Sequence, residues 1–270
     1  MEGTMENDSL ILRSDQDGIA VLTMNSPKSI NALSETMLAT MSEILDDIAA
    51  DRSVKAVVLR SGGKHFCAGH NLKEMTARRA DVDGGFQYFQ DLFAKCSAMM
   101  LRVVRLPQLV IAEVKGIATA AGCQLVASCD LAVSAEDAKF ATSGVNIGLF
   151  CSTPMVALAR NVPRKLAMEM LLLGEFLPAA RVAAMGLVTR VVPLAELEGA
   201  CMDMARIIAD KSPAAVKIGK RAFYEQLEMP LEQAYAFAGR TMAENMMAKD
   251  TIAGIGAFTR KEPMPEWTGE

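Results

Sequence analysis

The sequence is poor in histidine and has no closely paired cysteines. Its 270 residues include two histidines, His65 and His70, and none of its six cysteines form a C-x-x-C pair. This is poor material for a zinc site, so we expect no metal centre. Because disulfide frameworks favour short secreted chains, we expect reduced thiols, most of them buried as small apolar side chains. The cysteines are Cys67, Cys96, Cys123, Cys129, Cys151 and Cys201.

Long apolar runs and an excess of positive charge are also missing. No run reaches the ~20 apolar residues that a membrane-spanning helix needs. The net charge of −4 disfavours a general nucleic-acid or anionic-membrane partner. Residues 1–8 are acidic and polar, unlike a signal peptide or an arginine-rich transit peptide. We therefore expect a cytoplasmic protein that binds neither nucleic acid nor membranes.

The glycine patterns of nucleotide-binding proteins are absent too. Without a Walker or Rossmann pattern, nucleotide hydrolysis and NAD chemistry are not expected. The chain is instead rich in apolar residues, which make up 51% of it. Its length suits one large domain, or one domain with an appendage, built around a sizeable core.

The first half alternates short apolar runs with helical patterns. Asp17-Gly18 predicts the turn of a hairpin, Ser34 is a suitable helix N-cap, and Pro107 predicts the end of a long helix. The expected strands cover 10–12, 19–23 and 54–59, and the expected helices cover 35–50 and 86–106. Alternating strands and helices favour an α/β fold with a mainly parallel sheet.

The second half is mostly helical. Gly174 and Gly186 are expected to end helices, and prolines stand where helices should begin. The predicted helices cover 154–159, 165–173, 179–185, 194–211, 214–227 and 231–247. We therefore divide the chain into a core over 1–211 and a helical C-terminal region over 212–270.

Two loops have the pattern of a strand, a glycine turn and a helix. One runs from Ala120 to Leu125 after an apolar strand, and the other runs from Lys64 to Leu72. The start of a helix offers free backbone N–H groups and the positive end of its dipole, which suit a developing oxyanion. The nearest polar side chain is that of Gln124, whose amide cannot transfer a proton near neutral pH.

These loops, with further motifs in the same order, resemble the crotonase superfamily of enoyl-CoA hydratases and isomerases. The resemblance spans Gly18 to Trp267, and within it residues 118–130 and 148–154 are similar to the enoyl-CoA hydratase domain-containing protein 3 group. The motifs include Asn31-Ala32-Leu33, the loop 65–72, and the stretches 112–130, 184–188 and 256–261.

The resemblance implies a spiral of β-β-α units with a helical C-terminal subdomain that serves oligomerisation. It also implies homotrimers, often paired as hexamers, and an acyl-CoA thioester as the bound molecule. Coenzyme A would then be part of the substrate, with no covalently bound cofactor. By position, the backbone N–H groups of His70 and Ala121 would hold the thioester oxygen.

The resemblance also assigns residues to coenzyme A. The loop backbone would receive the adenine and the pantetheine, two lysines would meet the phosphates, and a phenylalanine would come from a neighbouring subunit. These residues are Phe66, Cys67, Ala68, Gly69, Lys28, Lys261 and Phe258.

The chain departs from the hydratase pattern where that pattern has its two glutamates. Gln124 and Gly144 fill these positions, and Ser152 fills a later position that carries an acid in some isomerases. Hydration needs one group to take a proton from water and another to supply one to the α-carbon. Neither Gln nor Gly can do so, and we expect hydration of enoyl-CoA to be weak or absent.

Other activities remain open at this stage. A histidine in this loop also occurs in decarboxylases of the superfamily, so His70 could serve a decarboxylase or a thioesterase as a proton donor. Cys151 would be a nucleophile only with a stabilised thiolate. A non-catalytic protein that binds acyl-CoA and regulates a partner is the third alternative.

Overall fold

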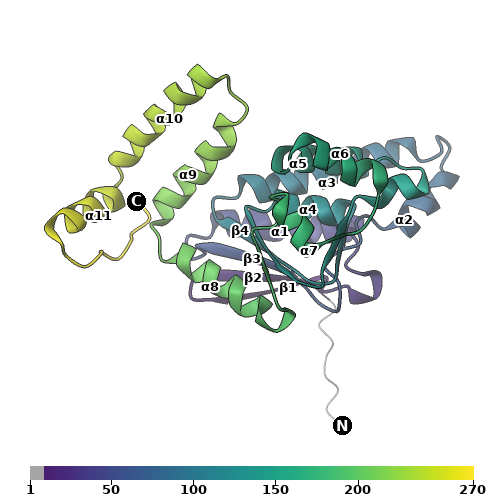
Figure 1. Cartoon of the computed structure of the whole chain (residues 1–270), viewed down its shortest axis with the longest axis horizontal. Coiled ribbons are helices and arrows are strands. Elements are labelled where there is room, and N and C mark those ends of the chain that lie inside the picture. The colour runs from purple at the N-terminus through teal and green to yellow at the C-terminus, as the bar shows by residue number, and fades with distance from the viewer. Residues whose placement is uncertain (1–8) are drawn as a thin grey trace, which may run out of the picture.

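The computed structural model describes residues 9–270 and is built around a six-stranded sheet (Figure 1). The strand order is β1-β2-β3-β4-β6-β9; β1 is antiparallel to β2, and every other neighbouring pair is parallel. The strands are β1 (Ile11–Gln16), β2 (Ile19–Met24), β3 (Ala56–Ser61), β4 (Leu109–Val114), β6 (Leu131–Ala135) and β9 (Arg190–Val192). The predicted mainly parallel sheet is confirmed.

Helices cover both faces of this sheet. Figure 1 shows α1, α3 and α4 above it, and α8 packs below it against β3, β4 and β6. These core helices are α1 (Glu35–Ala50), α2 (Leu72–Ala77), α3 (Phe86–Arg105), α4 (Ala121–Ser128), α5 (Ser152–Asn161), α6 (Arg164–Leu173), α7 (Ala179–Ala184) and α8 (Leu197–Ala209). Ser34 caps α1 as predicted, because its side chain accepts a hydrogen bond from the backbone N–H of Met37.

The predicted hairpin between β1 and β2 is present. Asp17 and Gly18 have φ values of 53° and 75°, the left-handed conformation that a two-residue turn between antiparallel strands requires. Gly174 and Gly186 follow α6 and α7 with positive φ, as expected of residues that end helices.

A second sheet of three short strands leads into the candidate site. Its order is β5-β7-β8, with β5 at Ile117–Thr119, β7 at Lys139–Ala141 and β8 at Leu177–Pro178. Helix α4 begins two residues after β5, so the first turn of α4 is fixed by this sheet. The strands are too short for an apolar repeat, and the sequence did not predict them as strands.

Three helices form the C-terminal region and extend away from the core (Figure 1). They are α9 (Pro213–Gln226), α10 (Leu231–Met246) and α11 (Lys249–Arg260). The first two agree with prediction, but α11 was missed. Gly254 and Gly256 weaken its helical pattern in the sequence, whereas in the structure Gly254 lies against the ring of Trp267.

Buried polar groups attach α9 to the core. The Nζ of Lys220 lies 2.6 Å from Oδ2 of Asp130 and also donates to the carbonyl oxygens of Val103 and Gln108. The hydroxyl of Tyr224 donates to the other oxygen of Asp130. Burial raises the pKa of Asp130 and lowers the pKa of Lys220, and the attraction between the two charges opposes both shifts. The position of α9 therefore depends on a buried ion pair.

The end of the chain folds back on the same region. Asp250 at the start of α11 accepts hydrogen bonds from the hydroxyl of Ser212 and from the backbone N–H of Thr268. The indole N–H of Trp267 donates to the carbonyl oxygen of Asp210. These contacts join the tail to the beginning of α9.

Candidate functional site

The two loops singled out in the sequence meet in the structure. Gly69 has φ +88°, and a Cβ added to it would stand 3.0 Å from Cβ of Ala120 and 3.1 Å from the backbone nitrogen of Ala121. The carbonyl oxygen of Gly69 accepts a hydrogen bond from the backbone N–H of Leu33. A side chain at position 69 would therefore collide with the beginning of α4, and only glycine suits both the backbone conformation and the space.

Two backbone N–H groups at this junction have no hydrogen-bond partner in the described structure. Neither the N–H of His70 nor that of Ala121 donates a hydrogen bond to any group within residues 9–270. Ala121 is the first residue of α4, and Ala120 before it adopts φ 50° and ψ −122°, a conformation that is strained for a residue with a Cβ. Free N–H groups at the positive end of a helix are suited to stabilising a carbonyl oxygen that gains negative charge.

Asn31 holds the first loop in place. It is fully buried with φ +50°, and its Nδ2 lies 3.1 Å from each of the carbonyl oxygens of Gly62, His65 and Phe66. Its Oδ1 accepts a hydrogen bond from the backbone N–H of Ser26. In the sequence Asn31 was only part of a motif. A buried amide that joins three carbonyl groups is a structural role that its chain position alone does not reveal.

The expected coenzyme A loop has its backbone donors already engaged. The N–H groups of Phe66 and Cys67 both donate to the carbonyl oxygen of Ile117, and that of Ala68 donates to Ile30. The carbonyl oxygen of Ala68 accepts no hydrogen bond from the described part of the chain. This segment can therefore offer a ligand a carbonyl acceptor but not its N–H groups.

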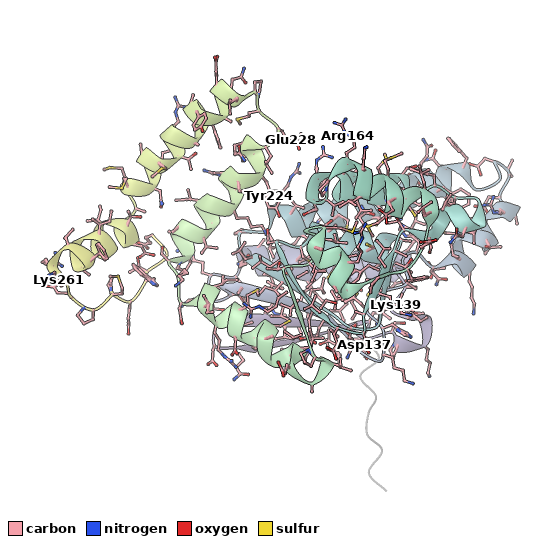
Figure 2. All side chains as sticks on the ribbon, viewed as in Figure 1. Asp137, Lys139, Arg164, Tyr224, Glu228 and Lys261 are labelled. Atoms are coloured by element: carbon pink, nitrogen blue, oxygen red, sulfur yellow. The ribbon has the colours of Figure 1, made fainter. Side chains whose placement is uncertain are left out.

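The remaining coenzyme A residues are not brought together within one chain. Lys28 is exposed on the short 3-10 helix Pro27–Ser29. Phe258, 74% exposed, and Lys261 lie at the end of α11, and Figure 2 shows Lys261 at the far end of the C-terminal helices. For these two residues to join the site, they would have to come from another copy of the chain.

Gln124 and Gly144, which the resemblance places where hydratases have glutamates, lie in buried surroundings. Gln124 is in the first turn of α4, and its Oε1 has no hydrogen-bond partner among residues 9–270. Gly144 lies in the 3-10 helix Ser143–Ile147, where a Cβ would come within 2.4 Å of the carbonyl oxygen of Leu149 and 2.8 Å of Sγ of Cys151. Gly144 is thus enclosed, and neither position carries an acid.

His70 is largely buried beside the free N–H groups. Its Nδ1 lies 3.4 Å from the carbonyl oxygen of Leu33, and its ring meets that of Phe93 edge-on at 5.5 Å between centroids. A carbonyl only accepts, so this contact places the proton on Nδ1 and leaves Nε2 as an acceptor. Nε2 is buried and has no partner within the described chain. Burial lowers the pKa of His70, which keeps the ring neutral at pH 7 and unsuited to donating a proton.

The cysteines are all unpaired and buried within the described chain. Burial raises the pKa of the Cys151 thiol, and the hydrogen bond involving Gly144 only partly opposes this. The pKa of Cys67 is raised by burial to about 12. These environments favour the thiol over the thiolate and argue against Cys151 as a nucleophile.

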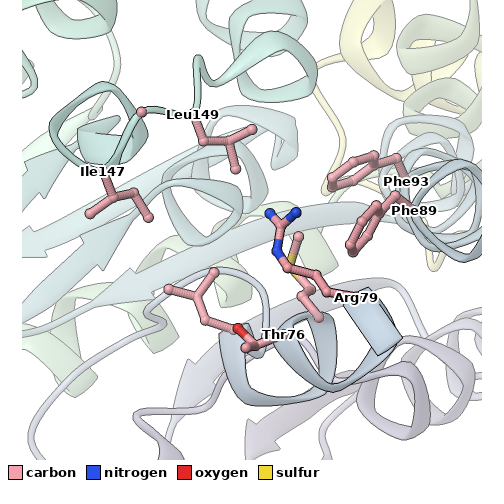
Figure 3. A pocket seen from close by; sticks show the side chains of 9 residues that line it. Thr76, Arg79, Phe89, Phe93, Ile147 and Leu149 are labelled. Carbon is pink, nitrogen blue, oxygen red and sulfur yellow. The ribbon is translucent and has the colours of Figure 1, made fainter. Parts of the chain in front are cut away.

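A cavity of about 290 Å³ lies beside this junction, between α2, α3 and the loop that follows Gly144 (Figure 3). Phe93 lines it and touches the ring of His70, and Leu149 lines it and donates its N–H to the carbonyl oxygen of Gly144. The full lining is Leu72, Met75, Thr76, Arg79, Phe89, Phe93, Ile147, Gly148 and Leu149. Its walls are mostly apolar, and its size is near the lower end of typical ligand pockets, about 300 Å³.

Within residues 9–270, no group of three or more His, Cys, Asp or Glu side chains is placed to hold a metal ion. None of the helices in that range is both long and apolar enough to cross a bilayer.

The fold and the paired loops together define a class of protein. The chain belongs to the enoyl-CoA hydratase/isomerase family, whose model matches residues 14–270. The predicted resemblance to the crotonase superfamily, and to the enoyl-CoA hydratase domain-containing protein 3 group within it, is confirmed.

Particular relatives are similar over nearly the whole chain. The human mitochondrial enoyl-CoA hydratase domain-containing protein 3 is 45% identical over 94% of this chain and 82% of its own length. Its crystal structure has a TM-score of 0.91 and covers 96% of this chain and 100% of that one, at 42% identity. An enoyl-CoA hydratase from Mycobacterium smegmatis is 52% identical with a TM-score of 0.92, covering 96% of this chain and 99% of that one.

The comparison corrects one expectation. The related proteins from human, Rattus norvegicus and Mus musculus are named mitochondrial. The cytoplasmic location expected from the polar first residues is therefore wrong.

Proposed function

We propose that the protein binds acyl-CoA thioesters through an oxyanion hole made of the His70 and Ala121 N–H groups, and that it hydrates enoyl-CoA weakly or not at all. One observation carries the proposal: the junction keeps two backbone donors that are unpaired within residues 9–270, while Gln124 and Gly144 supply no carboxylate. Backbone donors do not depend on side-chain identity, so Ala121 serves as well as a glycine. Membership of the family supports the thioester as ligand.

Coenzyme A itself is proposed to lie along the loop that Asn31 holds. The free carbonyl oxygen of Ala68 is suited to accept from the adenine amino group or a pantetheine amide, with Phe66, Cys67 and Gly69 forming the surrounding wall. Exposed Lys28 is free to approach a phosphate. Phe258 and Lys261 complete the site only if a neighbouring subunit supplies them.

A binding measurement and an activity assay test this function. Coenzyme A and crotonyl-CoA should both raise the melting temperature of the protein, because a ligand that binds only the folded state stabilises it. Hydration of crotonyl-CoA should stay below ~1 s⁻¹, the low end of typical enzymes. No thermal shift with either ligand would contradict binding, and faster hydration would contradict the loss of the acids.

His70 supports a second candidate function, a decarboxylase or thioesterase that uses the same oxyanion hole. The favouring observation is its buried Nε2, which lacks a partner within residues 9–270. With Nε2 as an acceptor, the ring would take up a proton or orient water rather than donate a proton. A panel of acyl-CoAs, including malonyl types, compared between wild type and His70→Ala distinguishes the cases. Turnover that falls in the variant favours the enzyme, and tight binding without turnover favours a regulatory protein.

We also propose that the protein forms homotrimers, alone or paired as hexamers, through the C-terminal helices of residues 212–270. Large apolar side chains are exposed along α10 and α11, where a monomer would leave them in water. They include Leu231, Tyr235, Met242, Met247 and Phe258, each at least 71% exposed. Light scattering should give a mass of three or six chains, and Tyr235→Lys with Met242→Lys should lower it. A monomeric wild type would contradict this proposal.

A further inference from the structure

The cavity beside the oxyanion hole contains one charged side chain. Thr76 is the one other polar residue in its lining, and Arg79 is the only ionisable one within the described chain. Figure 3 shows the guanidinium of Arg79 directed into the space between the phenylalanine rings of α3 and the side chains of Ile147 and Leu149. A single positive charge in an otherwise mostly apolar cavity is unusual for a site that binds a purely hydrocarbon chain.

Arg79 has no carboxylate partner in the part of the chain that the structure describes. The ion pairs formed within residues 9–270 do not include it, although eleven such contacts occur there. Its guanidinium lies over the ring of Phe89, 5.5 Å from the centroid. Such a cation–π contact holds the guanidinium near the ring and leaves its N–H groups available for a ligand.

The cavity neighbours the proposed oxyanion hole, as two of its lining elements show. Phe93 contacts His70, which contributes one of the backbone donors. Helix α2, which carries Met75 and Thr76 into the lining, begins two residues after His70. An acyl chain whose thioester oxygen is held at His70 and Ala121 therefore has this cavity as the adjoining space for its far end.

We propose that Arg79 makes the site selective for acyl-CoA thioesters whose acyl chain ends in a carboxylate. This inference rests on the proposed function, since it assumes that a thioester is bound. The apolar walls would cover the methylene groups, and the planar guanidinium would pair with the terminal carboxylate through two parallel hydrogen bonds. Arg79 is exposed to solvent, which weakens the pairing and keeps the expected preference moderate.

Adipyl-CoA and hexanoyl-CoA form a matched pair for the test, because both acyl chains have six carbons and differ in a terminal carboxylate or methyl group. Dissociation constants are measured by calorimetry on the full chain, with free coenzyme A as a third ligand. We expect wild type to bind adipyl-CoA about tenfold more tightly than hexanoyl-CoA. Arg79→Met should abolish or reverse this preference, and Arg79→Lys should keep part of it, since lysine retains the charge without the two-pronged geometry.

Arg78→Met is the matched control. Arg78 precedes Arg79 in the chain and also stacks on an aromatic ring, that of Tyr88, at 5.0 Å, but it does not line the cavity. This variant should retain the wild-type preference. An equal change in both variants would attribute the effect to net charge and overturn the inference.

Two other results would overturn it. An unchanged adipyl-to-hexanoyl ratio in Arg79→Met would show that the guanidinium does not meet the acyl terminus. An equal loss of affinity for adipyl-CoA, hexanoyl-CoA and free coenzyme A would place Arg79 on the phosphates instead. In both cases thioester binding itself persists, whereas a wild type that binds none of the three ligands refutes the proposed function as well.

Discussion

The sulfur of Cys151 occupies the space into which a side chain at Gly144 would extend. A Cβ on Gly144 would lie 2.8 Å from this sulfur and 2.4 Å from the carbonyl oxygen of Leu149. The second contact involves backbone, which cannot move aside as a side chain does. Position 144 therefore lacks both a carboxylate and the room that a longer residue would need.

Gly144→Glu should consequently destabilise the protein without restoring hydration. Overpacking of a buried site typically costs 1–3 kcal/mol, and we expect the free energy of unfolding to fall by about 2 kcal/mol or more in urea titrations. Gly199→Glu is the control, because Gly199 has nothing within 4 Å of its Cβ position. A double variant with Gln124→Glu that remains as stable as wild type and hydrates crotonyl-CoA above ~1 s⁻¹ would contradict this prediction.

Gly69→Ala should impair thioester binding by crowding the N–H of Ala121. Gly84→Ala provides the comparison, because Gly84 also has positive φ but no atom within 4 Å of its Cβ position. Both substitutions strain the backbone at a cost of ~1 kcal/mol, and Gly69→Ala should cost more because its Cβ also collides with the beginning of α4. Only Gly69→Ala should also weaken binding of crotonyl-CoA, by about tenfold, which corresponds to one lost hydrogen bond of ~1.4 kcal/mol. Equal affinities in calorimetry would refute the placement of the oxyanion hole.

Lys220→Met should be among the most destabilising substitutions in the chain. It leaves Asp130 buried at 7% side-chain exposure without its cation, a loss that typically costs 3–5 kcal/mol. Adding Asp130→Asn should recover part of this loss, because the uncompensated charge is then removed. Lys217→Met on the exposed side of α9 should stay within ~0.5 kcal/mol of wild type. Urea unfolding of the four proteins provides the measurement.

His70 should make stability fall as the pH is lowered below about 6.5. Burial lowers the pKa of His70 in the folded protein, whereas the unfolded chain titrates near 6.5. Between these two pKa values the unfolded state binds more protons, so the free energy of unfolding rises with pH. The dependence should be weaker in His70→Asn, and other titrating groups cancel in the difference between the two proteins. Parallel curves from pH 7.5 downward would show that His70 is not held neutral by the fold.

Much of the fold could be predicted because its elements carry local signals. Helix α1 has a capping serine and a regular apolar face, and the hairpin at Asp17-Gly18 has turn residues that few other structures accept. Helix α11 was missed because its two glycines hide the helical pattern. The contacts that stabilise it, from Asp250 to Ser212 and to Thr268, join residues distant in the chain. The sequence of residues 249–260 alone therefore does not reveal these stabilising contacts.

The candidate site could be predicted from the sequence only in part. The meeting of the Gly69 and Ala121 loops was expected from the resemblance to the crotonase superfamily. The enclosure of Gly144 did not, because glycine alone does not reveal what surrounds it. Arg79 was also missed, since an arginine on a short polar helix reads as an ordinary surface charge. Only the walls contributed by Phe89 of α3 and by Leu149, far along the chain, make it a cavity residue.

The amide of Asn31 has a consequence for how the protein recognises its ligands. Its hydrogen bonds to three carbonyl groups hold the loop in place before a ligand binds. Ligand binding therefore does not have to order this segment, and the loss of conformational entropy there is small. If coenzyme A lies along this loop as proposed, the rigid segment contributes the same affinity to every coenzyme A thioester. Discrimination among thioesters then depends on the acyl group, whose length and charge must fit the cavity.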